Sequence, residues 1–300
     1  MQGQNIFGNE KEIKRLEVQN RLFSELEKPL ILRLFSGKSG LSVLDIGCNN
    51  GAKAFGLFSH DMFSRVIGVD CDAELIEKAD KAYDSQKFSF YKADIESPEF
   101  AEVFNIQQFD IIYISFVLMH LRDPKALLVR LKSLLKPDGV LIVTEGNDGI
   151  SDISPCGTEL LRGALEILKK DKYAGNRETG KTLPNLLIKC GYSDTETLCE
   201  YISAKADDKE KKEDIFTTFF SYLPDDVELL LEEDPENAEY IAFSDWLQEN
   251  YESLRRVITD NKTEIKMGLK SLQKKAVIIN GKQNSCGKRS GILFKPAATQ

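Results

Sequence analysis

The sequence predicts an α/β fold built on a mostly parallel sheet with helices on both faces. From Val43 to Thr144, short apolar runs rich in β-branched residues alternate with longer amphipathic stretches. This alternation is typical of successive βαβ units, because parallel strands need long crossover connections. Most of the runs are apolar on both faces, as strands are when helices cover both sides of the sheet. The 300 residues, 42% of them hydrophobic, suffice for one large domain with an elaboration or for two small domains.

The first half of the chain supplies a helical segment and five predicted strands. Apolar side chains recur at helical spacing from about Glu10 to Phe35, and Pro29 leaves open two helices or one kinked helix. The predicted strands are Ser42–Ile46, Arg65–Val69, Phe88–Lys92, Phe109–Ile114 and Val140–Thr144. The predicted helices between them are Lys53–Ser59, Ala73–Tyr83, Glu99–Asn105 and Lys125–Leu135.

The second half is predicted to extend the same sheet and to insert a helical segment. It adds helices at Thr158–Lys172 and Leu183–Cys190, a possible sixth strand at Thr195–Ser203, several helices over Ile215–Lys275 and a last strand at Ser290–Lys295. If the last strand pairs with the sixth, the helices are an insertion within the domain. We therefore divide the chain into an N-terminal helical segment covering the ligand site, a core, a helical cap insertion and a returning strand, at residues 1–40, 41–204, 205–276 and 277–300.

A glycine-containing turn follows the first strand, in the segment Val43–Gly51. Glycine allows a backbone to approach a ligand closely, and the helix that begins after the turn offers free N–H groups. Asn49 can adopt the left-handed conformation that a further glycine would otherwise supply. The alternative is an ordinary tight turn between a strand and a helix.

Acidic residues follow the next two strands. Asp70 lies about 20 residues after Gly47, where a carboxylate can accept hydrogen bonds from both hydroxyls of a ribose. Asp94 is placed to accept from an exocyclic adenine amine, with Ile95 packing on the ring. Either acid alone could be a solvated turn residue. Three such features in succession, each at the carboxyl end of a predicted strand, indicate a nucleoside site at the edge where open α/β sheets bind ligands.

The position of Asp45 favours a cationic ligand. A dinucleotide site has the order G-x-G-x-x-G, whereas here an aspartate precedes Gly47, and the next glycine is Gly51. An aspartate beside a phosphate is unfavourable, but it suits a sulfonium that carries an amino group. The order therefore favours S-adenosylmethionine, with S-adenosylhomocysteine as its product, over NAD.

These segments together resemble the class I S-adenosylmethionine-dependent methyltransferases, and most nearly the subgroup that includes the ubiquinone and menaquinone biosynthesis methyltransferases. The resemblance covers about a third of the chain and rests on Val43–Gly51, Val69–Asp70, Ala93–Asp94, Phe109–Pro124 and Leu135–Thr144. It implies a Rossmann-like, seven-stranded, mostly parallel sheet whose last strand, Ser290–Lys295, runs antiparallel. It departs from the family at Asn49, where glycine is usual.

The resemblance also implies roles for individual residues. It implies that Asp45, Gly47 and Gly51 hold the methionine half of the cofactor, that Asp70 binds ribose, and that Asp94 and Ile95 hold adenine. The full set of cofactor-binding residues that we expect is Asp45, Gly47, Asn49, Gly51, Asp70, Cys71, Asp94, Ile95, Ser115 and Phe116.

Candidate catalytic residues follow the fourth and fifth strands. Holding donor and acceptor together provides much of the rate of methyl transfer, and a base is needed only if the acceptor must lose a proton. We expect His120 and Glu145 to fill that role. The alternatives are a packed histidine and a solvated loop acid. Apolar residues of the cap, such as Phe219, are candidates for the acceptor pocket.

Residues 175–182 match the phosphate-binding pattern G-x-x-x-x-G-K-T letter for letter. A phosphate cradle needs a strand before the loop and a helix after it. Here an amphipathic helix, Leu160–Lys172, precedes the loop. We therefore expect Lys181 to lie in a plain connection or at the edge of a lid.

Composition limits the remaining possibilities. The net charge of −8 and the pI of 5.1 disfavour nucleic acid and membrane surfaces as partners. The six scattered cysteines contain no C-x-x-C pair, and no signal-like or membrane-spanning segment is apparent, so we expect a cytoplasmic protein without a metal site. The predicted function is methyl transfer to oxygen, nitrogen or carbon of a small molecule. The alternatives are an NAD-type oxidoreductase and a non-catalytic S-adenosylmethionine-binding protein. The sequence does not indicate the acceptor or the oligomeric state.

Overall fold

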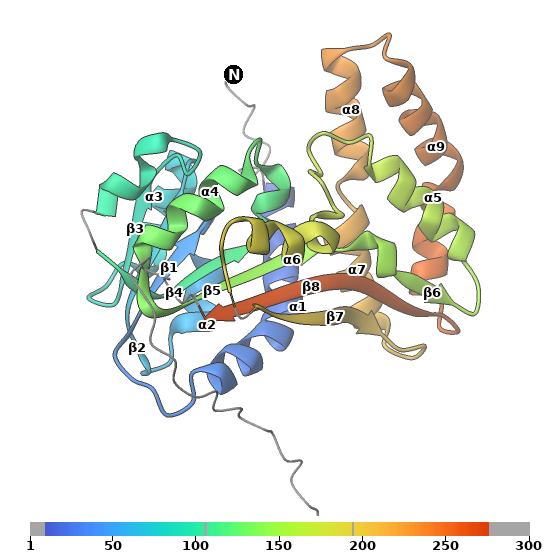
Figure 1. Cartoon of the computed structure of the whole chain (residues 1–300). Coiled ribbons are helices and arrows are strands. Elements are labelled where there is room, and N and C mark those ends of the chain that lie inside the picture. Colours follow the sequence, from blue (N-terminus) through green and yellow to red (C-terminus); the bar gives the residue numbers. More distant parts are fainter. Residues whose placement is uncertain (1–9, 105–106, 194, 276–300) are drawn as a thin grey trace, which may run out of the picture.

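The computed structural model in Figure 1 describes residues 10–104, 107–193 and 195–275. Its sheet has eight strands in the order β3-β2-β1-β4-β5-β8-β6, and β7 pairs with β8. The strands are β1 Leu41–Ile46, β2 Phe63–Asp70, β3 Phe88–Lys92, β4 Phe109–Ser115, β5 Leu135–Gly146, β6 Asp152–Ser154, β7 Thr195–Ala204 and β8 Glu264–Lys275. The pairs β1–β2, β1–β4, β2–β3 and β4–β5 are parallel, whereas β8 runs antiparallel to β5, β6 and β7. The predicted Rossmann-like, mostly parallel sheet is confirmed. The described residues form eight strands where seven were expected, because the short strand β6 pairs with β8.

Helices cover both faces of the sheet. They are α1 Glu10–Leu34, α2 Ala52–Phe58, α3 Ala73–Tyr83, α4 Pro124–Leu131, α5 Thr158–Leu168, α6 Thr179–Lys189, α7 Lys209–Phe220, α8 Leu223–Glu233 and α9 Ala238–Thr259. Short 3-10 turns occupy η2 Pro98–Phe104, η3 Leu118–His120, η4 Lys132–Leu134 and η5 Asp148–Ile150. The segment predicted to be a helix at Glu99–Asn105 is therefore a 3-10 turn over its described part.

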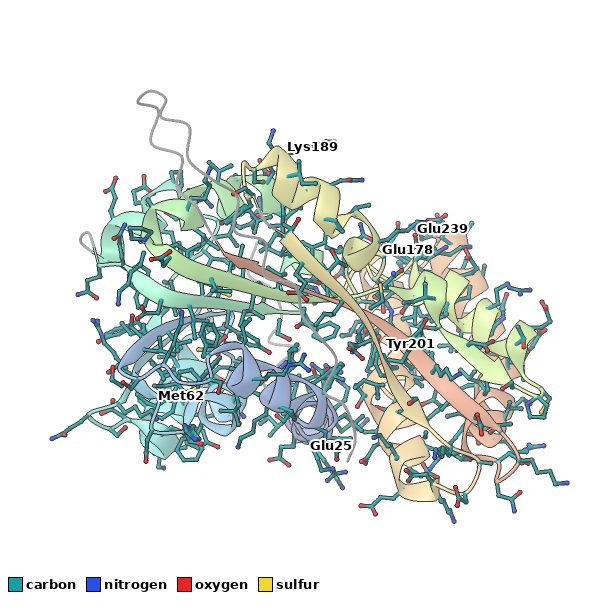
Figure 2. The ribbon with its side chains drawn as sticks, turned by 60° about the horizontal axis from the view of Figure 1, so that its bottom comes forward. Glu25, Met62, Glu178, Lys189, Tyr201 and Glu239 are labelled. Atoms are coloured by element: carbon teal, nitrogen blue, oxygen red, sulfur yellow. The ribbon has the colours of Figure 1, made fainter. Side chains whose placement is uncertain are left out.

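Adjacent strand residues bury their side chains on opposite faces. Val43 packs in a core with α1, α2 and α3, whereas Leu44 packs in a second core with α4 and α6. Figure 2 shows α1, which carries Glu25, and α6, which carries Lys189, on opposite sides of the sheet. A three-layer arrangement follows, because a strand buried on both faces needs apolar cover on both.

Local signals in the sequence explain where two of the helices begin. The side chain of Asp72 accepts hydrogen bonds from the N–H groups of Glu74 and Leu75, and so caps α3. Asp123 caps α4 through the N–H of Ala126, and Pro124 occupies the first turn, where a missing N–H costs nothing. Pro29 lies inside α1, which runs as one helix from Glu10 to Leu34.

A third core joins the cap to the sheet. It contains apolar residues of α5, α7, α8 and α9 together with Phe23 of α1 and Met267 of β8. In Figure 1, α8 and α9 project beside α5 at the end of the sheet away from β3. The helical cap expected over residues 205–276 is thus helical as far as Thr259.

The returning strand differs from the expectation. Glu264–Lys275, which we assigned to the helical segment, forms β8 and fills the antiparallel position beside β5. The physical reason is that the apolar residues alternate. Ile265, Met267 and Leu269 are buried, whereas Glu264 and Lys266 are exposed, which is a period of two. The strand predicted at Ser290–Lys295, like residues 277–300 generally, lies outside the described residues.

Candidate functional site

The carboxyl ends of the parallel strands bring the predicted residues to one edge of the sheet. In the register of the sheet, Ile46 of β1 pairs with Val69 of β2 and with Ile114 of β4. Ser115 of β4 in turn pairs with Thr144 of β5. The glycine turn after β1, Asp70, Ser115 and Glu145 therefore lie at the carboxyl ends of neighbouring strands, on the same edge of the sheet.

The glycine turn has the left-handed backbone that the sequence predicts. Gly47, Asn49 and Gly51 have φ values of 71°, 50° and 75°, so Asn49 does adopt the conformation expected of it. A Cβ at Gly47 would lie 2.5 Å from the Cγ2 of Val117. A glycine is therefore required where the turn meets the segment that follows β4.

Asp70 supports this turn through both carboxylate oxygens. Its Oδ2 accepts the N–H of Asn49 at 3.0 Å, and its Oδ1 accepts the N–H of Asp72 at 3.1 Å. Each oxygen can accept a further hydrogen bond, and the residue is half-buried. Asp70 can thus hold the turn and still face a ligand. Cys71, the next residue, is exposed.

The two residues expected at adenine lie in different environments. Asp94 is exposed, and its Oδ1 accepts the N–H of Glu96 at 2.9 Å. Ile95 is 9% exposed and packs in the core beneath α4 and α6. The structure leaves the carboxylate of Asp94 open to solvent but gives Ile95 little free surface.

An ammonium that we did not single out from the sequence lies in the middle of this edge. Lys53 of α2 donates to Ser115 Oγ at 2.6 Å and forms an ion pair of 2.9 Å with Glu27 Oε2. Its Nζ also lies 5.3 to 5.9 Å from the ring centroids of Phe23, Tyr113 and Phe116. Ser115 and Phe116, both predicted site residues, therefore contact Lys53.

Glu27 of α1 is the principal partner of Lys53. The residue is 3% exposed, and its Oε2 also accepts the hydroxyl of Tyr113 at 2.8 Å. Its other oxygen, Oε1, is buried and has no hydrogen-bond partner within the described structure. The signal that could have indicated this residue is an acid on an otherwise apolar face of the first helix.

Asp45 is buried next to these groups. Burial raises its pKa to about 7, a shift that the positive charge of Lys53 opposes and that Asp70 and Glu27 reinforce. The carboxyl is therefore poised to ionise when further positive charge approaches it.

Glu145 lies beneath the segment that follows β4. Its side chain is fully buried, and its Oε1 accepts the N–H groups of Val117 at 3.2 Å and Leu118 at 2.7 Å. Its Oε2 is buried without a hydrogen-bond partner in the described structure. Burial raises its pKa to about 8. The geometry is that of a support for this segment, and the catalytic role expected for Glu145 stays a prediction.

His120 is at the end of η3 and is exposed. The loop backbone at Gly175 passes close to the imidazole, since a Cβ there would lie 2.9 Å from its Nδ1. The surrounding chain and then the charge of Arg15 lower the pKa of His120. A lowered pKa keeps the imidazole in its neutral form at pH 7.

Two buried arginines meet at Tyr222 and connect the core to the cap. Arg177 is paired with Asp148 and donates to the Tyr222 hydroxyl at 2.8 Å. Arg15 is paired with Glu12, and its guanidinium lies 5.2 Å from the centroid of the Tyr222 ring. We call this set, with both carboxylates, the arginine cluster.

The phosphate-loop pattern at residues 175–182 lacks the context of a phosphate site. α5 precedes it, not a strand, and Lys181 extends into solvent with Glu178 3.5 Å away. Glu178 is labelled at the start of α6 in Figure 2. What the loop does supply is Arg177, a member of the arginine cluster.

Apolar residues of the cap are mostly core. Phe219 is 6% exposed and lies edge-on to Phe23, with ring centroids 6.2 Å apart. The guanidinium of Arg177 also lies over the Phe219 ring, 5.6 Å from the centroid of that ring. Phe219 therefore packs the cap against α1 and offers little surface to a ligand.

A methyltransferase family model and several proteins named as methyltransferases are similar to this chain. The model of the methyltransferase domain family matches residues 37–217, which is more than half of the chain. An uncharacterized methyltransferase of Schizosaccharomyces pombe is 32% identical over 111 residues, 35% of this chain and 40% of that protein. Juvenile hormone acid O-methyltransferase of Bombyx mori is 25% identical over 178 residues, 57% of this chain and 63% of that protein. The aligned part of the chain thus spans about half the length of these relatives.

A solved structure shares the fold at low identity. Phosphoethanolamine N-methyltransferase 2 of Haemonchus contortus, with S-adenosylhomocysteine bound, superposes with a TM-score of 0.53 at 17% identity. The match covers 91% of this chain and 59% of that one. By its sheet order, its glycine turn and the matched domain, this chain belongs to the methyltransferase domain family.

Proposed function

We propose that the protein transfers a methyl group from S-adenosylmethionine to a small-molecule acceptor. The observation that carries the proposal is the buried acidic edge next to the glycine turn, where Glu27 pairs with the ammonium of Lys53, and Asp45 and Glu145 are close enough for its charge to lower their pKa values. Buried carboxyl groups with raised pKa values are stabilised in their ionised form when a cation approaches, so the site favours a cation. S-Adenosylmethionine carries a sulfonium and an amino group, whereas the pyrophosphate of NAD would be repelled.

The described residues fit this cofactor. Among the described residues, Glu27 Oε1 and Glu145 Oε2 are buried oxygens without hydrogen-bond partners. Such atoms cost free energy unless a donor reaches them. Asp70 keeps acceptor capacity at the end of β2, and Asp94 is open to solvent after β3. Asp45 and the glycine turn would hold the methionine half, Asp70 the ribose and Asp94 the adenine.

The bound cofactor supplies an electrophilic methyl group on a sulfonium. The chain itself contributes position and exclusion of water, which account for much of the rate of such a displacement. Phe116, held in a left-handed backbone with φ 56° and packed 4.7 Å from Phe23, would form the wall between donor and acceptor. His120, neutral at pH 7, would take the proton if the acceptor has one to lose.

The acceptor is proposed to be a small molecule bound between this edge and the cap. The acidic composition supports it against nucleic acid. Within the described residues no helix has the length and hydropathy needed to cross a membrane. The free cysteines support a cytoplasmic location, since five described thiols are unpaired.

Binding calorimetry and an acceptor screen test the proposal. Wild-type protein should bind S-adenosylmethionine and S-adenosylhomocysteine and should not bind NAD. Incubation with radiolabelled cofactor and a panel of small carboxylic acids, phenols and amines should then label one acceptor class. Tight NAD binding without S-adenosylhomocysteine binding would indicate an oxidoreductase. Cofactor binding without turnover on any acceptor would indicate a non-catalytic binding protein.

A further inference from the structure

The ammonium of Lys53 has more hydrogen-bonding capacity than its salt bridge uses. The side chains of Lys53 and Glu27 are only 12% and 4% exposed, so the pair is held away from water. An ammonium has three N–H donors, and within the described structure Glu27 Oε2 and Ser115 Oγ accept two of them. One donor is left for a further acceptor.

Lys53 also lies between the two segments that flank the methionine half in the proposed function. It is in the first turn of α2, two residues after Gly51, and it contacts Ser115 and Phe116 at the end of β4. Three aromatic rings surround the ammonium. This shielding from water strengthens any charge-assisted hydrogen bond that the ammonium makes.

An amino-acid carboxylate entering this edge would also lie near several acidic residues. Asp45 and Glu27 are buried there, Glu145 is fully buried, and Asp70 follows the next strand. The two arginines of the arginine cluster already pair with carboxylates of the same chain. Arg15 makes a two-point contact with Glu12, and Arg177 makes one with Asp148. Lys53, which has an N–H donor left over, can still take an anion.

We propose that Lys53 binds the α-carboxylate of the cofactor's methionine half, and that Glu27 of α1 is the positioning residue that holds the ammonium there. This assignment rests on the proposed function for the identity of the ligand. It also gives α1 a role, because Glu27 joins that helix to α2 and, through the Tyr113 hydroxyl, to β4. Binding of the methyl donor and the position of α1 then both depend on the ammonium of Lys53.

The test compares ligands that differ in the carboxylate. Titration calorimetry would measure S-adenosylhomocysteine, which has the carboxylate, and 5′-methylthioadenosine, which lacks the whole amino-acid end. Decarboxylated S-adenosylmethionine, which lacks only the carboxylate, is compared with S-adenosylmethionine. Lys53→Met keeps the length of the stem and removes the charge. We expect a loss of about 10- to 100-fold in affinity for the two carboxylate ligands, the range of a lost charge-assisted hydrogen bond. Affinity for the other two should change less than about threefold.

Three further variants separate positioning from stability. Lys53→Arg should recover part of the lost affinity because it restores the charge. Glu27→Gln should weaken S-adenosylhomocysteine binding less than Lys53→Met does, and should add nothing in the double variant, in which no ammonium remains to be positioned. The double variant also removes both buried charges, so it stays informative if Lys53→Met alone is poorly folded. Lys78→Met, an exposed lysine on α3, is the matched control and should bind all four ligands like wild type.

Two results would overturn the assignment. Equal losses for ligands with and without the carboxylate would show that Lys53 only holds α1 and α2 together. Tighter S-adenosylmethionine binding by Lys53→Met would show that the ammonium competes with the cation of the cofactor. If wild-type protein binds none of these ligands, the proposed function itself fails, which is a different outcome from either.

Discussion

Arg177 and Asp148 form a two-point ion pair, with Nε–Oδ2 at 2.6 Å and Nη2–Oδ1 at 3.2 Å, between the loop before α6 and the turn after β5. The two side chains are 11% and 7% exposed. In the sequence Arg177 stands inside a phosphate-loop pattern, yet its partner is a carboxylate of the same chain. The pair fixes the loop that passes beside His120 and Tyr222.

Arg177→Met should destabilise the protein by about 3–5 kcal/mol, because it leaves Asp148 as a buried charge without a partner. Adding Asp148→Asn should recover part of this loss, since the uncompensated charge is then gone. Urea unfolding of both variants measures the difference. Arg162→Met is the matched control: its ion pair with Glu159 is exposed, and its loss should cost under about 1 kcal/mol. If the loss of unfolding free energy in the double variant equals the sum of the losses in the two single variants, the energetic coupling between Arg177 and Asp148 is contradicted.

Glu145→Gln should retain stability and methyl transfer at neutral pH, because the amide oxygen can still accept the N–H groups of Val117 and Leu118. Glu145→Ala should lose about 2–4 kcal/mol, since it leaves both donors buried and unpaired. Turnover of the Gln variant near the wild-type rate identifies a support. Its abolition in a folded Gln variant that binds cofactor normally would establish Glu145 as the base.

The stability of the wild-type protein should fall relative to Glu145→Gln as pH rises from about 5 to 8. Burial raises the pKa of Glu145 to about 8 in the folded protein, whereas the unfolded carboxyl has a pKa of about 4.3. Between these values the folded state holds a proton that the unfolded state releases, so its stabilising contribution is lost with rising pH. Melting temperatures across this range, with exposed Glu159→Gln as control, measure the effect. A difference independent of pH would show that Glu145 is ionised in the fold.

Asp70→Ala should weaken S-adenosylhomocysteine binding about thirtyfold to nearly a thousandfold, because it would remove the two charge-assisted hydrogen bonds that we propose to ribose, part of which water recovers. Asp70→Asn keeps one acceptor and should fall in between. Asp72→Asn is the control: Asp72 caps α3, and asparagine caps as well as aspartate. Wild-type affinity in a folded Asp70→Ala variant would require the nucleoside site to be placed elsewhere.

Lys181→Ala should leave cofactor affinity and melting temperature unchanged, since the lysine extends into solvent and its nearest acid is on its own helix turn. Addition of ATP and magnesium should not stabilise the wild-type protein. A thermal shift assay with and without nucleotide checks both statements. A magnesium-dependent shift with ATP that disappears in Lys181→Ala would show that the loop binds phosphate.

The parts of the fold that the sequence predicts are those with a local signal. Apolar runs that alternate with amphipathic stretches predict β1 to β5. The left-handed backbone of the glycine turn is predicted by Gly47, Asn49 and Gly51. β8 was missed because its apolar residues were counted with the helices before it, although Ile265, Met267 and Leu269 alternate as in a strand.

The site is predicted where residues end strands and missed where helices contribute at a distance. Asp70 and Ser115 can be placed from their strands alone. Glu27 and Lys53 are 26 positions apart, and only the packing of α1 on α2 brings them together. Likewise, no local sequence pattern indicates that Arg177 pairs with Asp148, which lies 29 positions earlier.

The pairing of β7 with β8 places both ends of the cap at adjacent positions, since Ala204 lies opposite Ile265. Figure 2 shows β7, with Tyr201, lying alongside β8. A turn of a few residues could join the two strands there as a hairpin, with the order and direction of every strand kept. Evolution can therefore lengthen, shorten or exchange the intervening helices without rethreading the sheet. A lineage with this architecture can diversify what it methylates while the donor half of the molecule is inherited unchanged.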